Sequence, residues 1–323
     1  MNKIMLFTHT DLDGVGCAIL AYLAFGKENV DVEYCDYGNV NEKIEEFFEQ
    51  EELYRSYNWV FITDISVSDS IAKMIDILGG GAKVRLFDHH ETALALNSYA
   101  TWACVRIFDR DTDKKTSGTE LFYKYLNTNK YFDKYIDRHG SRTVSNIREF
   151  VDIVRNWDTW RWKEELGDEG IVSKWTNDLL YIYGRDRFIQ WSLIHIKSNL
   201  SFDLTDKVLL EQKHNALDMY IKEKDKQLIT SEDFAGNQFG IVFAERDFSE
   251  LGNNLSELHP ELAYIAMIDI SKGTVSYRTT RDDVDLGDEI AHSYGGGGHK
   301  KSAGSRFDLT SIYVKVFNDV FSR

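Results

Sequence analysis

The sequence has no long apolar stretch. Only Ile4–Phe7 is apolar before polar residues begin, which is too short for the apolar part of a signal peptide. The longest apolar run, Cys17–Phe25, is too short to span a bilayer. These absences exclude an obvious export signal and a membrane span, so we expect a cytoplasmic protein with no membrane partner.

Cysteine is also scarce, with Cys17, Cys35 and Cys104 scattered along 323 residues. Their spacing is not that of a metal site. An odd number of isolated cysteines indicates a reducing compartment and buried thiols.

Basic residues are outnumbered, with 38 Lys and Arg against 53 Asp and Glu, which gives a formal net charge of −15. This balance argues against a protein that coats long nucleic acid through non-specific charge attraction. It leaves a nucleotide substrate open, because bound divalent cations reverse the field of a carboxylate-rich site.

The chain is long enough for two domains, and 43% apolar residues supply material for two cores. In the first ninety residues, strand-like runs alternate with helix-like segments. This alternation predicts a parallel sheet covered by helices on both faces. We expect strands at 3–8, 30–34, 58–63 and 82–87, and helices at 14–25, 41–50 and 68–78.

The rest of the chain changes character twice. A loop at 109–118 is followed by helix-like sequence that continues to about residue 199, with helices at 119–126 and 144–157. Strand-like segments return only later, at 239–244, 262–268 and 274–279. We therefore predict an α/β protein in which a doubly wound, mainly parallel sheet (1–200) is followed by a connecting helix or linker (201–230) and a second, smaller α/β domain (231–323).

Acidic and histidine residues gather directly after three of the predicted strands. The first strand is followed by three of them, the third by one and the fourth by three: His9, Asp11 and Asp13; Asp64; and Asp88, His89 and His90. Ligands of open α/β sheets bind at the carboxyl ends of the strands, so these side chains should share one edge. Carboxylates that are packed together repel one another unless cations lie among them. Mixed Asp and His ligation suits manganese or magnesium, and this many carboxylates is enough for two ions with one carboxylate bridging.

Each of these residues, taken alone, has a structural explanation. Asp13 precedes Gly14 and a helix, which suits an N-cap. A single Asp64 at a strand end is more often structural, and an isolated His9 is more often a hydrogen-bonded polar residue. The metal-site interpretation depends on the coincidence of three strand ends at the same edge.

These segments resemble the motifs of the DHH family of phosphoesterases. HTDLDG at 9–14 is similar to the first motif, TDIS at 63–66 to the second, and DHH at 88–90 is the triplet that names the family. A fourth motif contributes one more aspartate, for which Asp158 in NWDTW is the best match and Asp152 the alternative.

The resemblance implies which of these residues bind each metal ion and which contact the substrate. One ion would be held by His9, Asp11 and Asp64, and the other by Asp13, Asp64, His89 and Asp158, with Asp64 bridging. His90 would face the substrate phosphate, and Asp88 would orient His89 or the loop. We expect two manganese ions, with magnesium or cobalt as alternatives.

The C-terminal part carries a second resemblance. GGGGHKKSAG at 295–304 is similar to the glycine-rich motif of the DHH-associated domain, and Arg278 in VSYRTT matches the substrate-contacting arginine of that domain. Consecutive glycines let a backbone approach a ligand and point amides at an anion, although a flexible loop is the alternative. Nearby positive groups suit a phosphate or a terminal nucleotide. The expected substrate-binding residues are Arg278, Gly296, Gly297, Gly298, His299 and Lys300.

The resemblance implies hydrolysis by two ions about 3.5–4 Å apart. We expect a phosphodiesterase that degrades very short oligonucleotides, with 3′-phosphoadenosine 5′-phosphate as a further substrate. The alternatives are a phosphodiesterase of cyclic or linear dinucleotides and, in another class, a catalytically silent nucleotide-binding protein. The expected partners are short single-stranded oligonucleotides or dinucleotides, and a homodimer is left open. The first domain should supply the chemistry and the second should hold the far end of the substrate.

Overall fold

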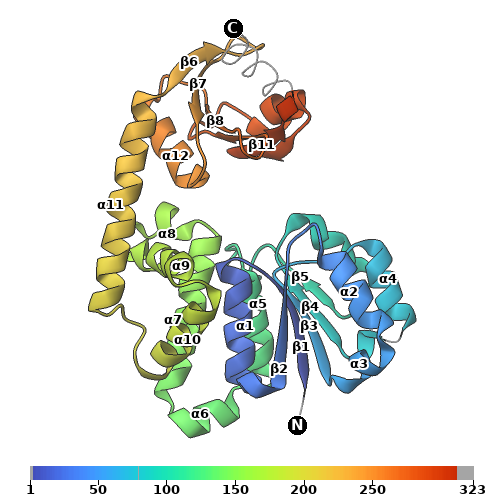
Figure 1. The fold of residues 1–323 in the computed structure, drawn as a ribbon. Helices are drawn as coiled ribbons and strands as arrows, with labels where there is room; N and C mark the ends of the chain where they lie inside the picture. Colours follow the sequence, from blue (N-terminus) through green and yellow to red (C-terminus); the bar gives the residue numbers. More distant parts are fainter. Residues whose placement is uncertain (1–2, 79, 311–323) are drawn as a thin grey trace. The chain divides into compact units, whose positions relative to one another are not determined.

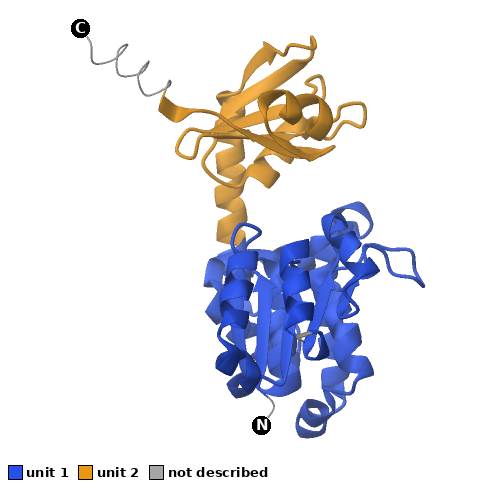
Figure 2. Ribbon diagram, turned by 90° about the vertical axis from the view of Figure 1, so that its right-hand side faces the viewer, with its two compact units in different colours: residues 1–210 blue, residues 211–323 orange. Residues whose placement is uncertain are grey.

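The computed structural model describes residues 3–78 and 80–310. It divides into two compact units, Met1–Leu210 and Glu211–Arg323, and helix α11 (Leu204–Lys226) runs across the boundary (Figure 1, Figure 2). Leu210 of this helix belongs to a core of the first unit, whereas Leu217 and Ile221 belong to a core of the second. Residues 311–323, the end of the predicted second domain, lie outside the described residues.

The first unit is built on a five-stranded parallel sheet with the order β2-β1-β3-β4-β5. Because both faces are covered, its inner strands are nearly continuous apolar runs instead of alternating ones. The alternation of the sequence predicts the first four strands but not β5, which is only three residues long. The strands are β1 (Ile4–His9), β2 (Val30–Cys35), β3 (Trp59–Thr63), β4 (Val84–Asp88) and β5 (Ala103–Val105).

Helices cover both faces of this sheet (Figure 1), and each face has its own core. One face is covered by α1 (Leu12–Phe25), α5 (Gly118–Thr128), α7 (Arg142–Asp158), α9 (Ile171–Tyr183) and α10 (Arg185–Ser198). The other is covered by α2 (Val40–Glu49), α3 (Glu51–Ser56), α4 (Asp69–Ile77) and the 3₁₀ segment η3 (Glu91–Ser98). Shorter segments complete the unit: η1 (Lys27–Asn29), η2 (Gly80–Ala82), α6 (Asp133–His139), α8 (Arg161–Glu164) and η4 (Gly167–Gly170).

The strand order locates a natural binding edge. The chain goes from β1 to β2 on one side and then returns to β3 on the other, so the direction of winding reverses between β1 and β3. In doubly wound sheets, ligands bind at the carboxyl ends of the strands beside such a reversal. His9 ends β1 and Asp64 directly follows β3, so both lie at this point.

The described part of the second unit contains a six-stranded mixed sheet with the order β10-β11-β9-β8-β7-β6, and among these strands only β7 and β8 run parallel. This arrangement and the parallel sheet of the first unit confirm the predicted fold class. The sequence does not predict β6 or α12. The elements are β6 (Ile229–Glu232), β7 (Gln238–Phe243), α12 (Phe248–Leu258), β8 (Ile265–Asp269), β9 (Thr274–Arg278), η5 (Leu286–Ala291), η6 (His292–Tyr294), β10 (Gly297–His299) and β11 (Ser302–Arg306).

Within the described residues, no helix combines the length and apolar character that a membrane crossing requires.

Candidate metal centre

The loop after β1 places three of the predicted residues at the start of α1. Asp11 is the N-cap of this helix, and its carboxylate accepts a hydrogen bond from the Gly14 amide at 3.1 Å. The capping role considered for Asp13 therefore belongs to Asp11. The other oxygen of Asp11 lies 2.9 Å from Nδ1 of His9, which is also 3.9 Å from the carboxylate of Asp64.

Asp13 is buried and is held by the N-terminus of α5. Its two oxygens accept the amides of Gly118 and Thr119 at 2.6 and 2.9 Å, and the Thr119 hydroxyl donates to its backbone carbonyl at 2.6 Å. The free amides and the dipole of a helix N-terminus stabilise a carboxylate there. Sequence reasoning missed this support, because the polar text at 109–118 predicts a loop and nothing more. The Ser117-x-x-Glu120 spacing is typical of a helix start and was the available signal.

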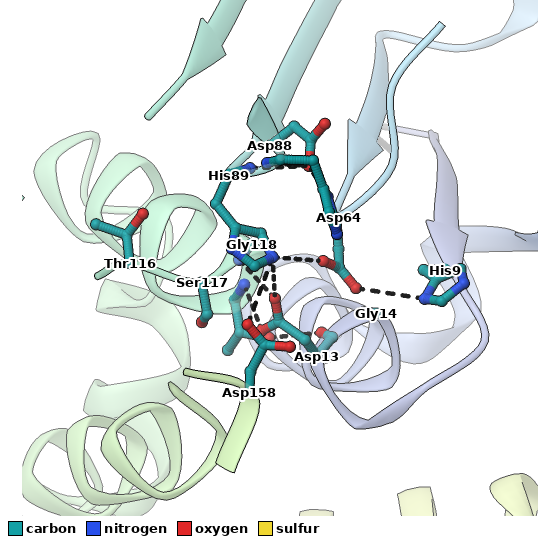
Figure 3. Close-up of polar contacts among 12 residues, drawn as sticks. His9, Asp13, Gly14, Asp64, Asp88, His89, Thr116, Ser117, Gly118 and Asp158 are labelled. Carbon is teal, nitrogen blue, oxygen red and sulfur yellow. Dashed lines mark hydrogen bonds and ion pairs between the residues drawn. The ribbon is translucent and has the colours of Figure 1, made fainter. Parts of the chain in front are cut away.

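Asp64 lies at the centre of the cluster shown in Figure 3. Its φ of 56° is in the left-handed region, which turns the chain sharply as it leaves β3. Its side chain is 1% exposed, and its backbone amide donates to the Phe87 carbonyl at 2.9 Å. One carboxylate oxygen faces His9 and the other lies 3.2 Å from Nε2 of His89.

His89 joins Asp64 to two further carboxylates. Its Nε2 lies 3.5 Å from Oδ2 of Asp158 and 3.7 Å from Oδ2 of Asp13 (Figure 3). Asp158 is the last residue of α7, so the end of that helix delivers it to the cluster. Asp152, the alternative from the sequence, instead pairs with Arg155 at 2.9 Å on the same helix and has a side chain that is 42% exposed.

The ligand-type atoms form compact groups. His9, Asp11 and Asp64 form one, Asp13, His89 and Asp158 form another, and Asp64, Asp88, His89 and His90 form a third. The ligand atoms within each group lie within 4.8 Å of one another. Buried oxygens of Asp64 and Asp158 have no hydrogen-bond partner among the described residues. A buried polar atom without a partner costs free energy, and a cation would remove that cost. The donor set therefore suits divalent cations.

The pKa values of two carboxyl groups in the cluster are also shifted from their usual range. Burial raises the pKa of Asp64 far above its usual range, and the charges of Asp13 and Asp11 raise it further. Burial and the same two carboxylates raise the pKa of Asp158, against a smaller lowering by the charge of Lys115. Bound cations would reverse these shifts, because they favour the ionised carboxylates.

Asp88, His90 and Tyr37 form a chain of contacts beside the cluster. Asp88 is fully buried and lies 2.7 Å from Nδ1 of His90, and it also accepts the backbone amide of His89 at 2.8 Å. The carboxylate thus orients the ring of His90 and the loop backbone, and not the ring of His89. Nε2 of His90 lies 2.9 Å from the hydroxyl of Tyr37, an exposed residue that sequence reasoning missed because no motif marks it.

Two of the substrate-binding residues predicted for the second unit, Arg278 and His299, share one face of its sheet. In β10, β11 and β9 the register places His299 opposite Ser302, and Ser302 opposite Arg278. Directly opposite residues of antiparallel strands point to the same face. Arg278 also donates to the hydroxyl of Ser249 on α12 at 3.2 Å, which identifies this face as the one that α12 covers.

The glycine-rich segment differs from the expected amide nest. Gly297–His299 forms strand β10 and pairs with β11, and Lys300 lies in the turn of the hairpin with its side chain exposed. A Cβ on Gly296 would come within 2.0 Å of the Gly304 carbonyl, and one on Gly298 within 2.5 Å of the Ala303 backbone. These two glycines are required for close packing of the hairpin, whereas Gly297 has open space around it.

A cluster of Asp and His at the reversal point of a parallel sheet is typical of hydrolases that use divalent cations. The family described as the DHH family, N-terminal domain, matches residues 3–149. Oligoribonuclease NrnB of Bacillus subtilis (strain 168) is 34% identical over 303 residues, which cover 93% of this chain and 71% of that protein. The chain therefore belongs to the DHH family of phosphoesterases, hydrolases that act on phosphodiester bonds.

Solved structures agree on the fold. A DHH domain described as a member of a family of ribosomal proteins matches with a TM-score of 0.60 and 12% identity, covering 98% of this chain and 86% of that one. Exonuclease RecJ bound to manganese matches with a TM-score of 0.54 and 14% identity, covering 97% and 89%. At these identities, the likeness shows the fold alone.

Gly118→Ala should disrupt the cluster without changing any ligand-type residue. A Cβ at this position would come within 2.6 Å of the Asp64 Cβ, although alanine is otherwise favoured over glycine in a helix. We expect manganese affinity to fall about 10- to 100-fold, as for lost support around a metal ligand. Titration calorimetry with manganese measures it, and Gly38→Ala is the control because no described residue comes within 4 Å of a Cβ there. Equal affinities in both variants would contradict the tight packing of α5 against Asp64.

Asp158→Asn and Asp152→Asn form a matched pair on α7. The structure brings only Asp158 to the cluster, so its substitution should lower manganese affinity by more than the roughly 10- to 100-fold that is lost with a group that supports a ligand, whereas Asp152→Asn should keep the affinity of the parent. Elemental analysis after dialysis against limiting manganese distinguishes the two. Metal loss in the Asp152 variant alone would reverse the assignment.

Proposed function

We propose that the chain is a two-metal phosphodiesterase that degrades very short oligonucleotides. The observation that carries this proposal is the position of Asp64, whose carboxylate lies between the group of His9 and Asp11 and the group of Asp13, His89 and Asp158. One shared carboxylate between two groups of donors is what a pair of neighbouring ions requires. The 34% identity to an oligoribonuclease over most of the chain supports the choice of substrate.

The residues assigned to the ions are His9, Asp11, Asp13, Asp64, His89 and Asp158, with manganese as the proposed metal. When bound, two such ions supply a nucleophilic water and neutralise charge that develops on the phosphoryl oxygens. The protein holds these donors rigidly: Asp11 caps α1, Asp13 accepts two amides of α5, and Asp64 is fixed by the turn after β3. Preorganised donors lose little free energy in reorganisation during the reaction.

His90 is the proposed contact to the substrate phosphate. Asp88 holds Nδ1, so Nε2 is the ring nitrogen that remains for a ligand, and the Tyr37 hydroxyl lies against it. A substrate oxygen would take the place of this hydroxyl. Tyr37 thus keeps the ring oriented before the substrate arrives, and Asp88 keeps it oriented afterwards.

The histidines of the triplet should separate metal binding from substrate binding. His89→Ala should lose manganese, because Nε2 of His89 lies among three carboxylates. His90→Ala should keep its metal and lose turnover by about 100-fold, the scale of one strong donor to a developing charge. Metal content and kcat are measured on the same preparations. Equal metal loss in both variants would refute this division.

A substrate panel tests the proposed function. Manganese-loaded protein is assayed with RNA and DNA of 2–5 nucleotides, 3′-phosphoadenosine 5′-phosphate, cyclic dinucleotides and pyrophosphate. We expect the highest kcat/KM on the short RNAs and no turnover after chelation. Binding without any turnover would instead indicate a silent nucleotide-binding protein, and a preference for cyclic dinucleotides would change the substrate class.

A further inference from the structure

A cationic pocket of about 430 Å³ lies on the first unit, and none of the proposed metal ligands lines it. Three carboxylates line it, against six cationic side chains: Lys114, Lys115, Lys124, Arg148, Arg155 and Arg161. This local excess of positive charge occurs in a chain whose net charge is −15. Cations in a concave site repel one another unless anions balance them, so the pocket is suited to a negatively charged ligand.

The pocket and the metal centre are built on the same two helices. The first turn of α5 holds Asp13 through the amides of Gly118 and Thr119, and the same helix supplies Lys124 to the pocket. Helix α7 ends at Asp158 and supplies Arg155, which precedes it by about one turn. The pocket and the metal centre therefore share the helices α5 and α7, and only two residues separate Arg155 from Asp158.

Carboxylates fix several of the cations in position. Glu120 is 9% exposed and pairs with Lys124 at 2.9 Å and with Arg155 at 3.4 Å. Lys114 and Arg161 both lie 3.0 Å from the same oxygen of Glu165. These pairs hold the side chains in defined geometry, which reduces the conformational entropy lost when a ligand binds.

Other donors of the pocket remain available to a ligand. Lys115 and Arg148 are exposed and form no ion pair or side-chain hydrogen bond with another described residue. Nε of Arg155 is buried and has no hydrogen-bond partner among the described residues. One oxygen of Glu120 also lacks a hydrogen bond, but this carboxylate already faces two cations. The polar groups of the pocket that lack a partner are therefore mainly positively charged hydrogen-bond donors.

The arrangement of these donors favours a phosphate monoester over a carboxylate. A monoester carries close to two negative charges and three acceptor oxygens, and guanidinium and ammonium groups from several directions match it. We propose that this pocket binds the terminal phosphate of a short oligonucleotide while the scissile diester lies at the metal centre. The proposal rests on the proposed function and adds to it a residue set that recognises the end of the substrate.

The kinetic test compares trinucleotides that differ only at their ends. Wild type, Arg148→Ala and Lys115→Ala are assayed on an RNA trinucleotide with a 5′-phosphate, with a 3′-phosphate, or with neither. Lys134→Ala is the control, because Lys134 is exposed on α6 and lies outside the pocket. We expect wild type to prefer one phosphorylated end, which identifies the end that is bound. The preference should fall about tenfold in each pocket variant, the scale of one charge-assisted hydrogen bond, and stay unchanged in the control.

A binding experiment distinguishes failure of this proposal from failure of the proposed function. Chelator-treated protein is titrated by calorimetry with 5′- and 3′-phosphorylated diribonucleotides. Binding of one of them that weakens about tenfold in Arg148→Ala supports the pocket, even if the wild type hydrolyses no oligonucleotide and the proposed function fails. Hydrolysis of trinucleotides with no preference for a terminal phosphate, or with the same preference in wild type and both variants, overturns the pocket and leaves the proposed function intact.

Discussion

Asp64→Asn should lose metal binding and lower kcat/KM on short RNA by about a thousandfold or more, because the proposed bridging carboxylate lies 3.9 Å from Nδ1 of His9 and 3.2 Å from Nε2 of His89. Asparagine is the sharpest substitution at this site. It keeps the shape of the side chain and tolerates the left-handed backbone at φ 56°, so the turn after β3 should be preserved. What changes is the charge and one acceptor oxygen.

The same variant should shift stability in opposite directions with and without metal. Without metal, burial and the neighbouring carboxylates raise the pKa of Asp64, so the ionised group destabilises the fold at neutral pH. The folded chain then keeps a proton that the unfolded chain releases, and metal-free stability should fall as the pH rises above the unfolded value of 3.8. Asparagine has no ionisable carboxyl group and avoids this cost, so the Tm of the chelated protein should rise.

With metal bound, the substitution should have the opposite effect and lower the stability of the protein. Manganese at 100 times its Kd would stabilise the wild type by about 2.7 kcal/mol per ion, and the variant should lose this stabilisation. Thermal melts of both proteins in chelator and in manganese measure the two effects together. A variant that melts like wild type in manganese and keeps full activity would refute a shared carboxylate at Asp64.

Some parts of the candidate metal centre can be predicted from the sequence because they are local. Strand ends carry His9, Asp11, Asp13 and Asp64 in short motifs, and the alternation of strands and helices places them at one edge. The support of Asp13 is different in kind. Gly118 donates to it across 105 residues of sequence, and no local pattern encodes such a contact.

Long-range packing also explains what the sequence could not assign in the second unit. Four consecutive glycines indicate that the backbone comes close to another group, but they do not identify that group. In the structure, Gly296 and Gly298 approach the neighbouring strand β11 of their own hairpin. The cationic pocket was equally hidden, because Lys115 lies in a predicted loop and Arg148 on a charged helix, where solvated side chains are the ordinary explanation.

Arg278→Ala should reduce kcat/KM on RNA trinucleotides by about 10- to 100-fold and leave manganese content at the wild-type level. All proposed metal ligands lie in the first unit, whereas Arg278 and His299 lie in one row across the sheet of the second. Burial lowers the pKa of the Arg278 guanidinium, which donates to two neutral groups of its own unit, the Tyr277 carbonyl and the Ser249 hydroxyl. A phosphate would add the charge-assisted bonds that these neutral acceptors do not supply.

His299→Ala should behave in the same way, because His299 shares the face of Arg278 through Ser302. Arg281→Ala is the matched control. It removes an arginine three residues away that is partly exposed and paired with Asp283 at 2.5 Å. It should keep the wild-type kcat/KM, and Arg278→Lys should recover part of the loss, because lysine restores the charge but not the planar fork.

Substrate size then tests whether the second unit binds a remote part of the substrate. Binding energy from a remote group raises turnover by orienting the scissile bond, and a small diester has no remote group to use. In Arg278→Ala and His299→Ala, kcat/KM should therefore fall much more for trinucleotides than for bis-p-nitrophenyl phosphate. Wild type should act at least about tenfold faster on 3-mers than on 24-mers, if the end of the substrate must be bound for efficient turnover. Equal losses on the diester and the trinucleotide would refute remote binding, and equal rates on 3-mers and 24-mers would refute the preference for short substrates.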